Sequence, residues 1–184
     1  MTRVHLVRHG RAAAGWDADP DPGLDALGKQ QAVDVGARLA PIGPLHVLTS
    51  PLLRCQETAA PLLAAWRYPL MIEPRIGEIP SPAGVAMADR GEWLRDAMRG
   101  TWTDLGLPFT AYRDAVLAAV RTCRQETVMF SHFVAINVVI GAALGSDALV
   151  SRRLDHVSVS TVEVDDDGSI RLVEGGREAD TVVR

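Results

Sequence analysis

The sequence is poor in cysteine, lacks a long apolar run and has no apolar leader, and each absence excludes a class of protein. Its 184 residues include only two cysteines, Cys55 and Cys123, which form no CxxC pair and no Cys/His cluster. They indicate reduced structural thiols and neither a disulfide framework nor a zinc site. The longest apolar run, 134–144, is interrupted by Asn137 and is shorter than the ~20 residues of a membrane-spanning helix. The first ten residues carry no apolar stretch of signal-peptide length, so we expect a cytoplasmic protein.

The chain also lacks an excess of basic residues. It has 19 Lys and Arg against 23 Asp and Glu, a formal net charge of −4, which argues against nucleic acid or a membrane surface as a partner. With 47% hydrophobic and 23% charged residues, the composition is typical of a globular domain and excludes a disordered chain. Composition leaves the oligomeric state open.

Short apolar strands alternate with segments of helical periodicity through most of the chain. The pattern predicts strands at 4–7, 46–49, 70–72 and 127–131, helices at 27–39, 51–66, 110–124 and 134–144, and a terminal hairpin at 157–164 and 170–173. Ser50 is the expected N-cap of the second helix, with Pro51 at the first helical position. This alternation predicts an α/β fold, a three-layer α/β/α sandwich with a mostly parallel sheet and an antiparallel edge hairpin.

Residues 79–108 differ from the rest, because they are rich in Pro, Gly, Arg and Trp and show helical periodicity only around 90–98. Thirty residues cannot build a core of their own. We therefore predict a single domain, 1–184, in which 79–108 form a cap insertion over the core.

Two interpretations of this insertion remain open. Arginines recur in it together with tryptophans, at Arg90, Trp93, Arg95, Arg99 and Trp102. The first interpretation is a solvated amphipathic helix whose tryptophans pack on the domain. The second is a cap whose arginines meet an anionic group of a substrate and whose tryptophans meet its apolar part.

Three of the predicted strands end in residues suited to binding an anion. The first strand leads into Arg8 and His9, the second into a helix that carries Arg54 in its first turn, and the fourth into His132. Ligands of parallel sheets bind outside the carboxyl ends of the strands. The two arginines and two histidines are therefore expected to form one anion pocket, to which the N-termini of the following helices add backbone N–H groups.

Phosphoryl is the anion that suits this set best. Each guanidinium offers paired donors that match two phosphate oxygens. A neutral imidazole is a competent nucleophile near pH 7, and a phosphorylated imidazole remains reactive enough to be hydrolysed. Since phosphoryl transfer needs mainly positioning and charge stabilisation, Arg8, Arg54 and His132 can support it without a metal.

The leaving oxygen also needs a proton. Glu78, at the start of the insertion, is the carboxylate best placed in the sequence to act as general acid and then as general base. Asp89 and Glu92 are alternatives for the same role.

At these residues the sequence resembles the histidine phosphatase superfamily, also called the phosphoglycerate mutase-like family. The matching motifs are LVRHG at 6–10, LGKQQA at 27–32, SPLLRCQETA at 50–59, Glu78, and FSH at 130–132. The resemblance implies that His9 is the phosphohistidine nucleophile, that Arg8, Arg54 and His132 hold the phosphoryl group, and that Glu78 handles the proton. It also implies an α/β fold and a reaction with no metal and no cofactor.

The chain departs from the family pattern at three positions. Members with mutase activity commonly carry a hydroxyl residue and an asparagine where this chain has Ala12 and Gly15, and small residues usually follow the second histidine, where this chain has Phe133. These departures favour hydrolysis over mutase transfer. Phe133 is expected at the substrate rim, together with Trp16 and Arg95.

We therefore expect a metal-independent phosphatase acting on a phosphorylated small metabolite. The alternatives are a protein phosphohistidine phosphatase, a mutase-type phosphotransferase, and a non-catalytic anion-binding module.

The other histidines are expected to be structural or exposed. His5 and His46 fall within strands, and His156, which precedes the hairpin, is expected on the surface although the site rim is within its reach. A P-loop-like run at 23–30 carries Gln30 where the Ser or Thr that binds magnesium is required, and no strand precedes it. We interpret its glycines as a helix entry.

Overall fold

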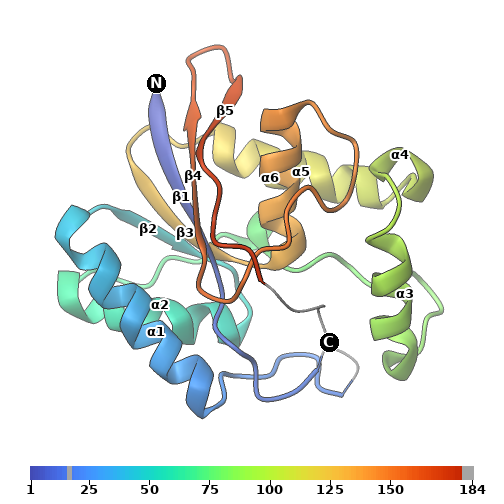
Figure 1. Cartoon of the computed structure of the whole chain (residues 1–184), viewed down its shortest axis with the longest axis horizontal. Helices are drawn as coiled ribbons and strands as arrows, with labels where there is room; N and C mark the ends of the chain where they lie inside the picture. The colour runs from blue at the N-terminus through green and yellow to red at the C-terminus, as the bar shows by residue number, and fades with distance from the viewer. Residues whose placement is uncertain (16–17, 180–184) are drawn as a thin grey trace.

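A five-stranded mixed sheet forms the centre of the computed structural model, which describes residues 1–15 and 18–179 (Figure 1). The strands are β1 Thr2–Arg8, β2 His46–Thr49, β3 Thr127–Ser131, β4 Val159–Val164 and β5 Ile170–Glu174, in the order β2-β3-β1-β4-β5. β1, β2 and β3 are parallel, and β4 is antiparallel to both β1 and β5. The predicted fold class, a mostly parallel sheet with an antiparallel hairpin at one edge, is confirmed.

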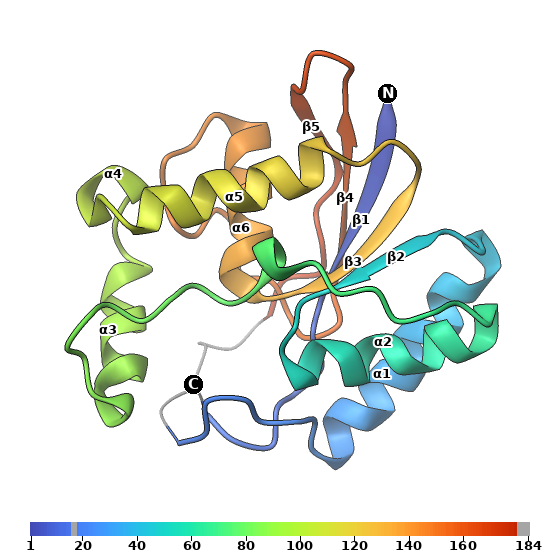
Figure 2. The same ribbon diagram turned by 180° about the vertical axis from the view of Figure 1, so that it is seen from behind.

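Helices cover both faces of the sheet (Figures 1 and 2). α1 Ala26–Leu39 and α2 Leu53–Trp66 lie on one face, and α5 Phe109–Arg121 and α6 Phe133–Leu144 lie on the other. Among the residues that the structure describes, none of the helices combines the length and apolar character needed to cross a bilayer.

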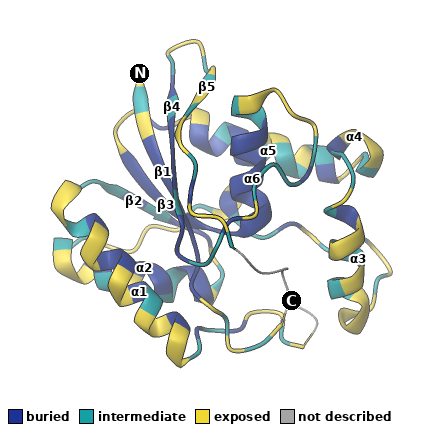
Figure 3. Ribbon diagram, viewed as in Figure 1, coloured by how far each residue is buried: buried dark blue, intermediate teal, exposed yellow. Residues whose placement is uncertain are grey.

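The alternation of side chains along the strands divides the interior into two cores. Val4, Leu6 and Met129 pack with α5 and α6 in one core. Val7 and Phe130 point to the other face and pack with α1 and α2. α6 is buried almost all round in its first nine residues, which accounts for its unbroken apolar sequence (Figure 3).

The second helix begins later than predicted. α2 starts at Leu53 with Leu52 as N-cap, so Ser50 is not the N-cap and Pro51 is not its first helical residue. The backbone N–H of Leu53 instead donates to Asp21 Oδ1 at 2.8 Å, and the Ser50 hydroxyl bonds to His132. A residue from the loop between β1 and α1 thus satisfies a free N–H of α2.

The strand predicted at 70–72 is wrong. This segment follows the free edge of β2 and makes a single bridge, between Thr49 and Ile72. Leu70, Met71 and Ile72 are exposed, and the chain then enters a 3-10 turn, η2 Pro74–Ile76. Since Pro74 comes so soon after Ile72, the segment is too short to build a ladder.

The insertion packs beside α5. It contains η3 Met87–Asp89, α3 Arg90–Ala97 and α4 Trp102–Leu105. Trp102 is 2% exposed and belongs to the α5/α6 core, and the Trp93 ring centroid lies 5.3 Å from that of Phe109. The tryptophans therefore attach α3 and α4 to the domain.

The loop after β1 passes very close to the start of α1. A Cβ at Gly28 would lie 2.1 Å from the carbonyl oxygen of Arg11, and a Cβ at Gly10 would lie 2.7 Å from the carbonyl oxygen of Gly28. Asp25 caps α1 at the same place, because its carboxylate accepts from the N–H of Gly28 at 2.7 Å. The close approach explains why glycine occupies positions 10 and 28.

Gly28→Ala should lower the free energy of unfolding by about 2 kcal/mol, because the added methyl group must displace the backbone of Arg11. Urea unfolding measures this loss. Gly100→Ala is the matched control, since a Cβ there meets its nearest atom at an ordinary 3.5 Å. Equal effects of the two substitutions would contradict the close approach.

Candidate active site

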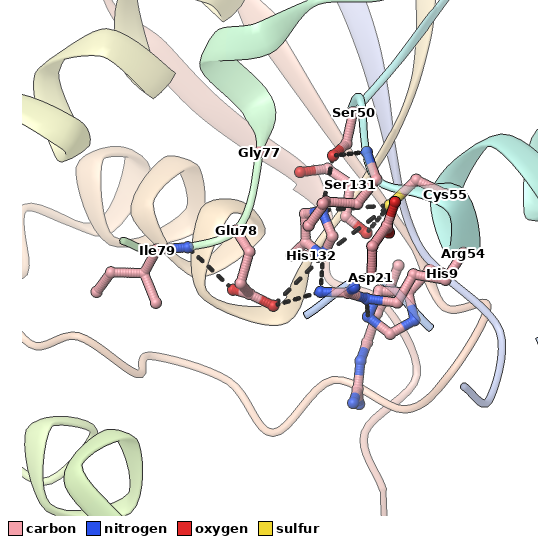
Figure 4. Close-up of polar contacts among 12 residues, drawn as sticks. His9, Asp21, Ser50, Arg54, Cys55, Gly77, Glu78, Ile79, Ser131 and His132 are labelled. Atoms are coloured by element: carbon pink, nitrogen blue, oxygen red, sulfur yellow. Dashed lines mark hydrogen bonds and ion pairs between the residues drawn. The ribbon is translucent and has the colours of Figure 1, made fainter. Parts of the chain in front are cut away.

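Five predicted site residues meet at the carboxyl edge of the parallel strands, and Figure 4 shows four of them, His9, Arg54, Glu78 and His132. β1 ends at Arg8 and leads into His9, α2 carries Arg54 in its first turn, His132 is the N-cap of α6, and Glu78 follows η2. Arg8, His9, Arg54 and His132 are all buried, with exposed fractions from 0% to 8%. The register aligns Arg8 with Ser131 on parallel neighbours, so the two histidines follow side by side with ring centroids 5.2 Å apart.

His9 is held as a neutral imidazole whose Nε2 carries no proton. Its Nδ1 lies 2.8 Å from the carbonyl oxygen of Gly10, which can only accept, so Nδ1 carries the proton. Its Nε2 accepts from Nε of Arg54 at 3.3 Å. Burial lowers the pKa of His9 well below 6.5, and His132 and the charges of Arg54 and Arg8 lower it further. Nε2 therefore keeps its lone pair at neutral pH, and in the free site this lone pair accepts from Arg54.

Both guanidinium groups keep an unused donor inside the site. Arg54 donates through Nη2 to Glu78 Oε2 at 3.3 Å and lies 3.2 Å from Nδ1 of His132, while its buried Nη1 has no partner among the described residues. Arg8 donates through Nη1 to Leu154 O at 2.5 Å, and its buried Nε is likewise unpaired in the described chain. Burial lowers the pKa of Arg8 to about 10, so it remains charged at pH 7. Buried cationic donors without partners mark a place for an anion.

Glu78 is a carboxylate in this arrangement. Burial alone raises the pKa of its carboxyl group, but His132, Arg54 and the backbone N–H of Ile79 more than offset this and lower it to about 2. The other acid candidates, Asp89 and Glu92, are exposed on η3 and α3. Among the described residues, only Glu78 of the three pairs with Arg54, and its Oε2 also lies 3.3 Å from Nδ1 of His132.

The main chain around Glu78 is fixed from two sides. The Tyr112 hydroxyl donates to the carbonyl of Gly77 at 2.9 Å, and the Ser131 hydroxyl donates to the carbonyl of Ile76 at 2.7 Å. Tyr112 is on α5, and Ser131 directly precedes His132. These two bonds tie the Glu78 loop to the elements that carry the rest of the site.

The SPLLRC segment also orients His132. Ser50 Oγ lies 2.8 Å from Nε2 of His132, and Cys55 Sγ lies 3.4 Å from the same nitrogen. Burial raises the pKa of the Cys55 thiol far above its ordinary value, so it stays protonated. Both cysteines are free and buried in the structure.

The donor set fits an anion better than a metal ion. His9, Glu78 and His132 could bring ligand atoms within 4.8 Å of one another. However, the Arg54 guanidinium lies among them, within 3.3 Å of all three side chains. A metal ion at this point would meet a fixed positive charge.

The three residues predicted at the substrate rim lie in different places. Phe133 lies against Arg8, whose guanidinium carbon is 5.2 Å from the ring centroid. Arg95 is exposed on α3. Trp16 lies outside the described residues.

His156 lies at the rim of the site, which its sequence position places within reach, although the sequence favours a surface residue. Its side chain is partly buried, with 28% exposed, and its Nε2 lies 3.5 Å from Nη2 of Arg8. Its ring centroid is 6.2 Å from that of His9. The antiparallel pairing of β4 with β1 brings the loop before β4 next to the end of β1. The one signal in the sequence is the position of His156 just before the hairpin.

Comparison with protein families gives a match over most of the chain. A model described as "Histidine phosphatase superfamily (branch 1)" matches residues 4–174. The "Probable phosphoglycerate mutase GpmB" of Shigella boydii serotype 18 is 29% identical and aligns over 95% of this chain and 90% of its own length.

Solved structures share the fold. YhfR of Bacillus stearothermophilus superposes with a TM-score of 0.78 at 22% identity, over 97% of this chain and 98% of its own. A putative alpha-ribazole-5'-P phosphatase of Escherichia coli superposes with a TM-score of 0.75 at 23% identity, over 99% and 100% of the two chains.

Tyr112→Phe should slow turnover of an alkyl phosphate about fivefold, because the carbonyl beside Glu78 loses its buried hydrogen bond, which is worth ~1 kcal/mol. Steady-state kinetics should show the loss in kcat while KM stays near its original value. Tyr68→Phe is the matched control, since that hydroxyl faces Met71 Sδ at 3.9 Å. A loss confined to stability, with kcat unchanged, would contradict a positioning role for Tyr112.

Proposed function

The chain belongs to the histidine phosphatase superfamily, a family of phosphatase and mutase enzymes, and we propose that it hydrolyses a phosphomonoester of a small metabolite, without a metal, through a phosphohistidine on His9. The observation that carries this proposal is an unprotonated Nε2 of His9 beside buried arginine donors that have no partner among the described residues. Nε2 of the neutral His9 faces Arg54, and buried donors of Arg8 and Arg54 have no partner in the described chain.

In the first step the arginines and His132 bind the phosphoryl oxygens. Nε2 of His9 attacks phosphorus, a P–N bond forms, and the P–O bond to the leaving group breaks. The leaving oxygen takes a proton from Glu78. Because the carboxylate of the free site has a pKa of about 2, this proton must arrive with the ester or be taken up as the ester binds.

In the second step water attacks the phosphohistidine. Glu78, now ionised, accepts a proton from the water, the P–N bond breaks, and inorganic phosphate leaves. His9 returns to its starting form, with the proton still on Nδ1.

Three observations support a small phosphoester as the substrate and hydrolysis as the outcome. His9 is only 7% exposed, which disfavours a phosphohistidine on the surface of another protein. The neutral imidazole of His9, which a simple anion site does not need, disfavours a module that only binds anions. Ala12 and Gly15 replace the polar residues common in mutases, and the solved neighbour from E. coli is named a phosphatase.

Mutase transfer is the second candidate, because the curated relatives carry the name of phosphoglycerate mutase. The two reactions share the phosphoenzyme and differ in its acceptor. We further propose that α3 of the insertion caps the pocket and that Arg95 meets the remainder of the substrate.

The wild-type protein should hydrolyse members of a phosphomonoester panel in the presence of a chelator and form an acid-labile phosphoenzyme. His9→Ala should lose both properties, with activity reduced at least 10³-fold, because the nucleophile is gone. Release of phosphate and trapping of labelled enzyme are the measurements. His46→Ala, a histidine at the start of β2, is the matched control.

Absence of both hydrolysis and phosphoenzyme in the wild type would overturn the enzymatic proposal. Activity that appears only with added divalent metal would overturn the metal-independent mechanism. Transfer to a second hydroxyl of the substrate in place of water would favour the mutase.

Glu78→Gln should slow hydrolysis of alkyl phosphates about 10²-fold more than that of nitrophenyl phosphate, because only the poor leaving group needs a proton. The ratio of kcat values on the two substrates measures this. Glu92→Gln is the control and should leave the ratio unchanged. If Glu92→Gln changes the ratio and Glu78→Gln does not, the acid is Glu92.

A further inference from the structure

The loop that precedes β4 holds His156 against the anion pocket. The backbone N–H of Arg8 donates to Ser158 O at 3.1 Å, and that of Val157 donates to Arg8 O at 3.1 Å, so the β1/β4 ladder continues to the site. Val157 has a φ of 50°, a conformation that β-branched residues rarely adopt. Its side chain is buried in the α1/α2 core, and Arg38 donates to its carbonyl at 2.9 Å. This strained residue fixes the direction of the chain at His156.

The open edge of Arg8 faces this imidazole. Nη1 of Arg8 is occupied by Leu154 O, and its Nε has no partner in the described chain. Nη2, which shares an edge of the guanidinium with Nε, meets Nε2 of His156 at a long 3.5 Å. A phosphoryl oxygen bound on the Nε/Nη2 edge would therefore lie beside Nε2 of His156.

We propose that His156 is a second phosphate-binding imidazole beside His132, which is an acceptor toward Arg8 in the free site and takes up a proton to become a donor to a phosphoryl oxygen when a dianion binds. The inference rests on the proposed function for the identity of the natural ligand. It assigns His156 to binding, whereas His9 and Glu78 act in the bond-making steps.

The charged groups around His156 decide its protonation. Arg8 faces it from β1, Arg11 from the following loop and Asp25 from the start of α1. On its own loop, Asp155 lies 4.0 Å from its Nδ1 and is itself bound by Arg177 at 2.7 Å. The neighbouring ring of His9 is neutral.

Without a ligand, the factors that favour the neutral imidazole of His156 outweigh those that favour its protonation. Burial and the charges of Arg8 and Arg11 outweigh the two carboxylates and lower the pKa of His156 to about 4. A bound dianion adds two negative charges next to Arg8, which raises the pKa of the imidazole. Since the pKa is higher in the complex, binding takes up a proton, and affinity rises as the pH falls toward about 4.

Sulfate is a suitable probe, because it stays a dianion near pH 6 and any proton taken up must bind to the protein. Calorimetric titration of the full chain, in two buffers that differ in ionisation enthalpy, gives the number of protons taken up. His156→Asn should remove part of the uptake seen with the wild type and weaken sulfate binding about tenfold. His156→Gln should behave in the same way and covers the case in which the asparagine variant does not fold. His46→Asn should match the wild type.

A residue that only supports Arg8 would weaken binding on substitution without changing proton uptake. That result, unchanged affinity in both variants, or no sulfate binding by the wild type would each overturn the proposal. The phosphatase assay separates this failure from that of the proposed function. Active wild type with unaltered variants refutes only the role of His156, whereas proton-linked sulfate binding without hydrolysis or phosphoenzyme refutes only the proposed activity.

Discussion

The contacts of the Arg54 guanidinium are the interaction on which the site depends. This buried cation contacts His9, the proposed nucleophile, through Nε, and Glu78 and His132 through Nη2. Burying a charge is costly unless it is paired, and here Glu78 supplies the compensating charge. Burial and His132 lower the pKa of His9, and Arg54 adds to this effect. At Glu78 burial raises the pKa, but His132 and Arg54 outweigh it and keep the carboxyl group ionised.

The strand register of the sheet positions the residues that make these contacts. Parallel neighbours β1 and β3 end in register, so His9 and His132 leave the sheet side by side. The antiparallel neighbour β4 brings a third imidazole to the same edge. Side-chain bonds from Ser50, Tyr112 and Ser131 then fix His132 and the Glu78 loop. Each group is held by elements from different parts of the chain.

Local patterns in the sequence predict the fold and much of the site because they report on neighbours along the chain. The strand ends at Arg8 and Ser131 and the helix start before Arg54 are visible as changes of periodicity. The carboxyl ends of parallel strands lie at the same edge of a sheet, where ligands bind, so the residues that follow them are expected to meet there. The false strand at 70–72 has the right apolar composition but no room to pair before Pro74. Composition alone does not report the length of a ladder.

The position of His156 beside Arg8 could not be predicted from the sequence for a different reason. Its place beside Arg8 depends on the pairing of β1 with β4, whose residues are about 150 positions apart in the chain. The start of α2 was misplaced for a similar reason, since its capping carboxylate, Asp21, comes from another loop. Contacts between distant segments decide both cases.

The hydrogen bond from Nδ1 of His9 to Gly10 O has a consequence for the timing of the proposed cycle. The bond uses a backbone oxygen that neither step consumes, so one tautomer of the nucleophile persists from the free enzyme through the phosphoenzyme and back. The imidazole needs no ring flip and no proton exchange between turnovers. The rate of the proposed cycle then depends on proton transfer at Glu78 and on the exchange of product for substrate.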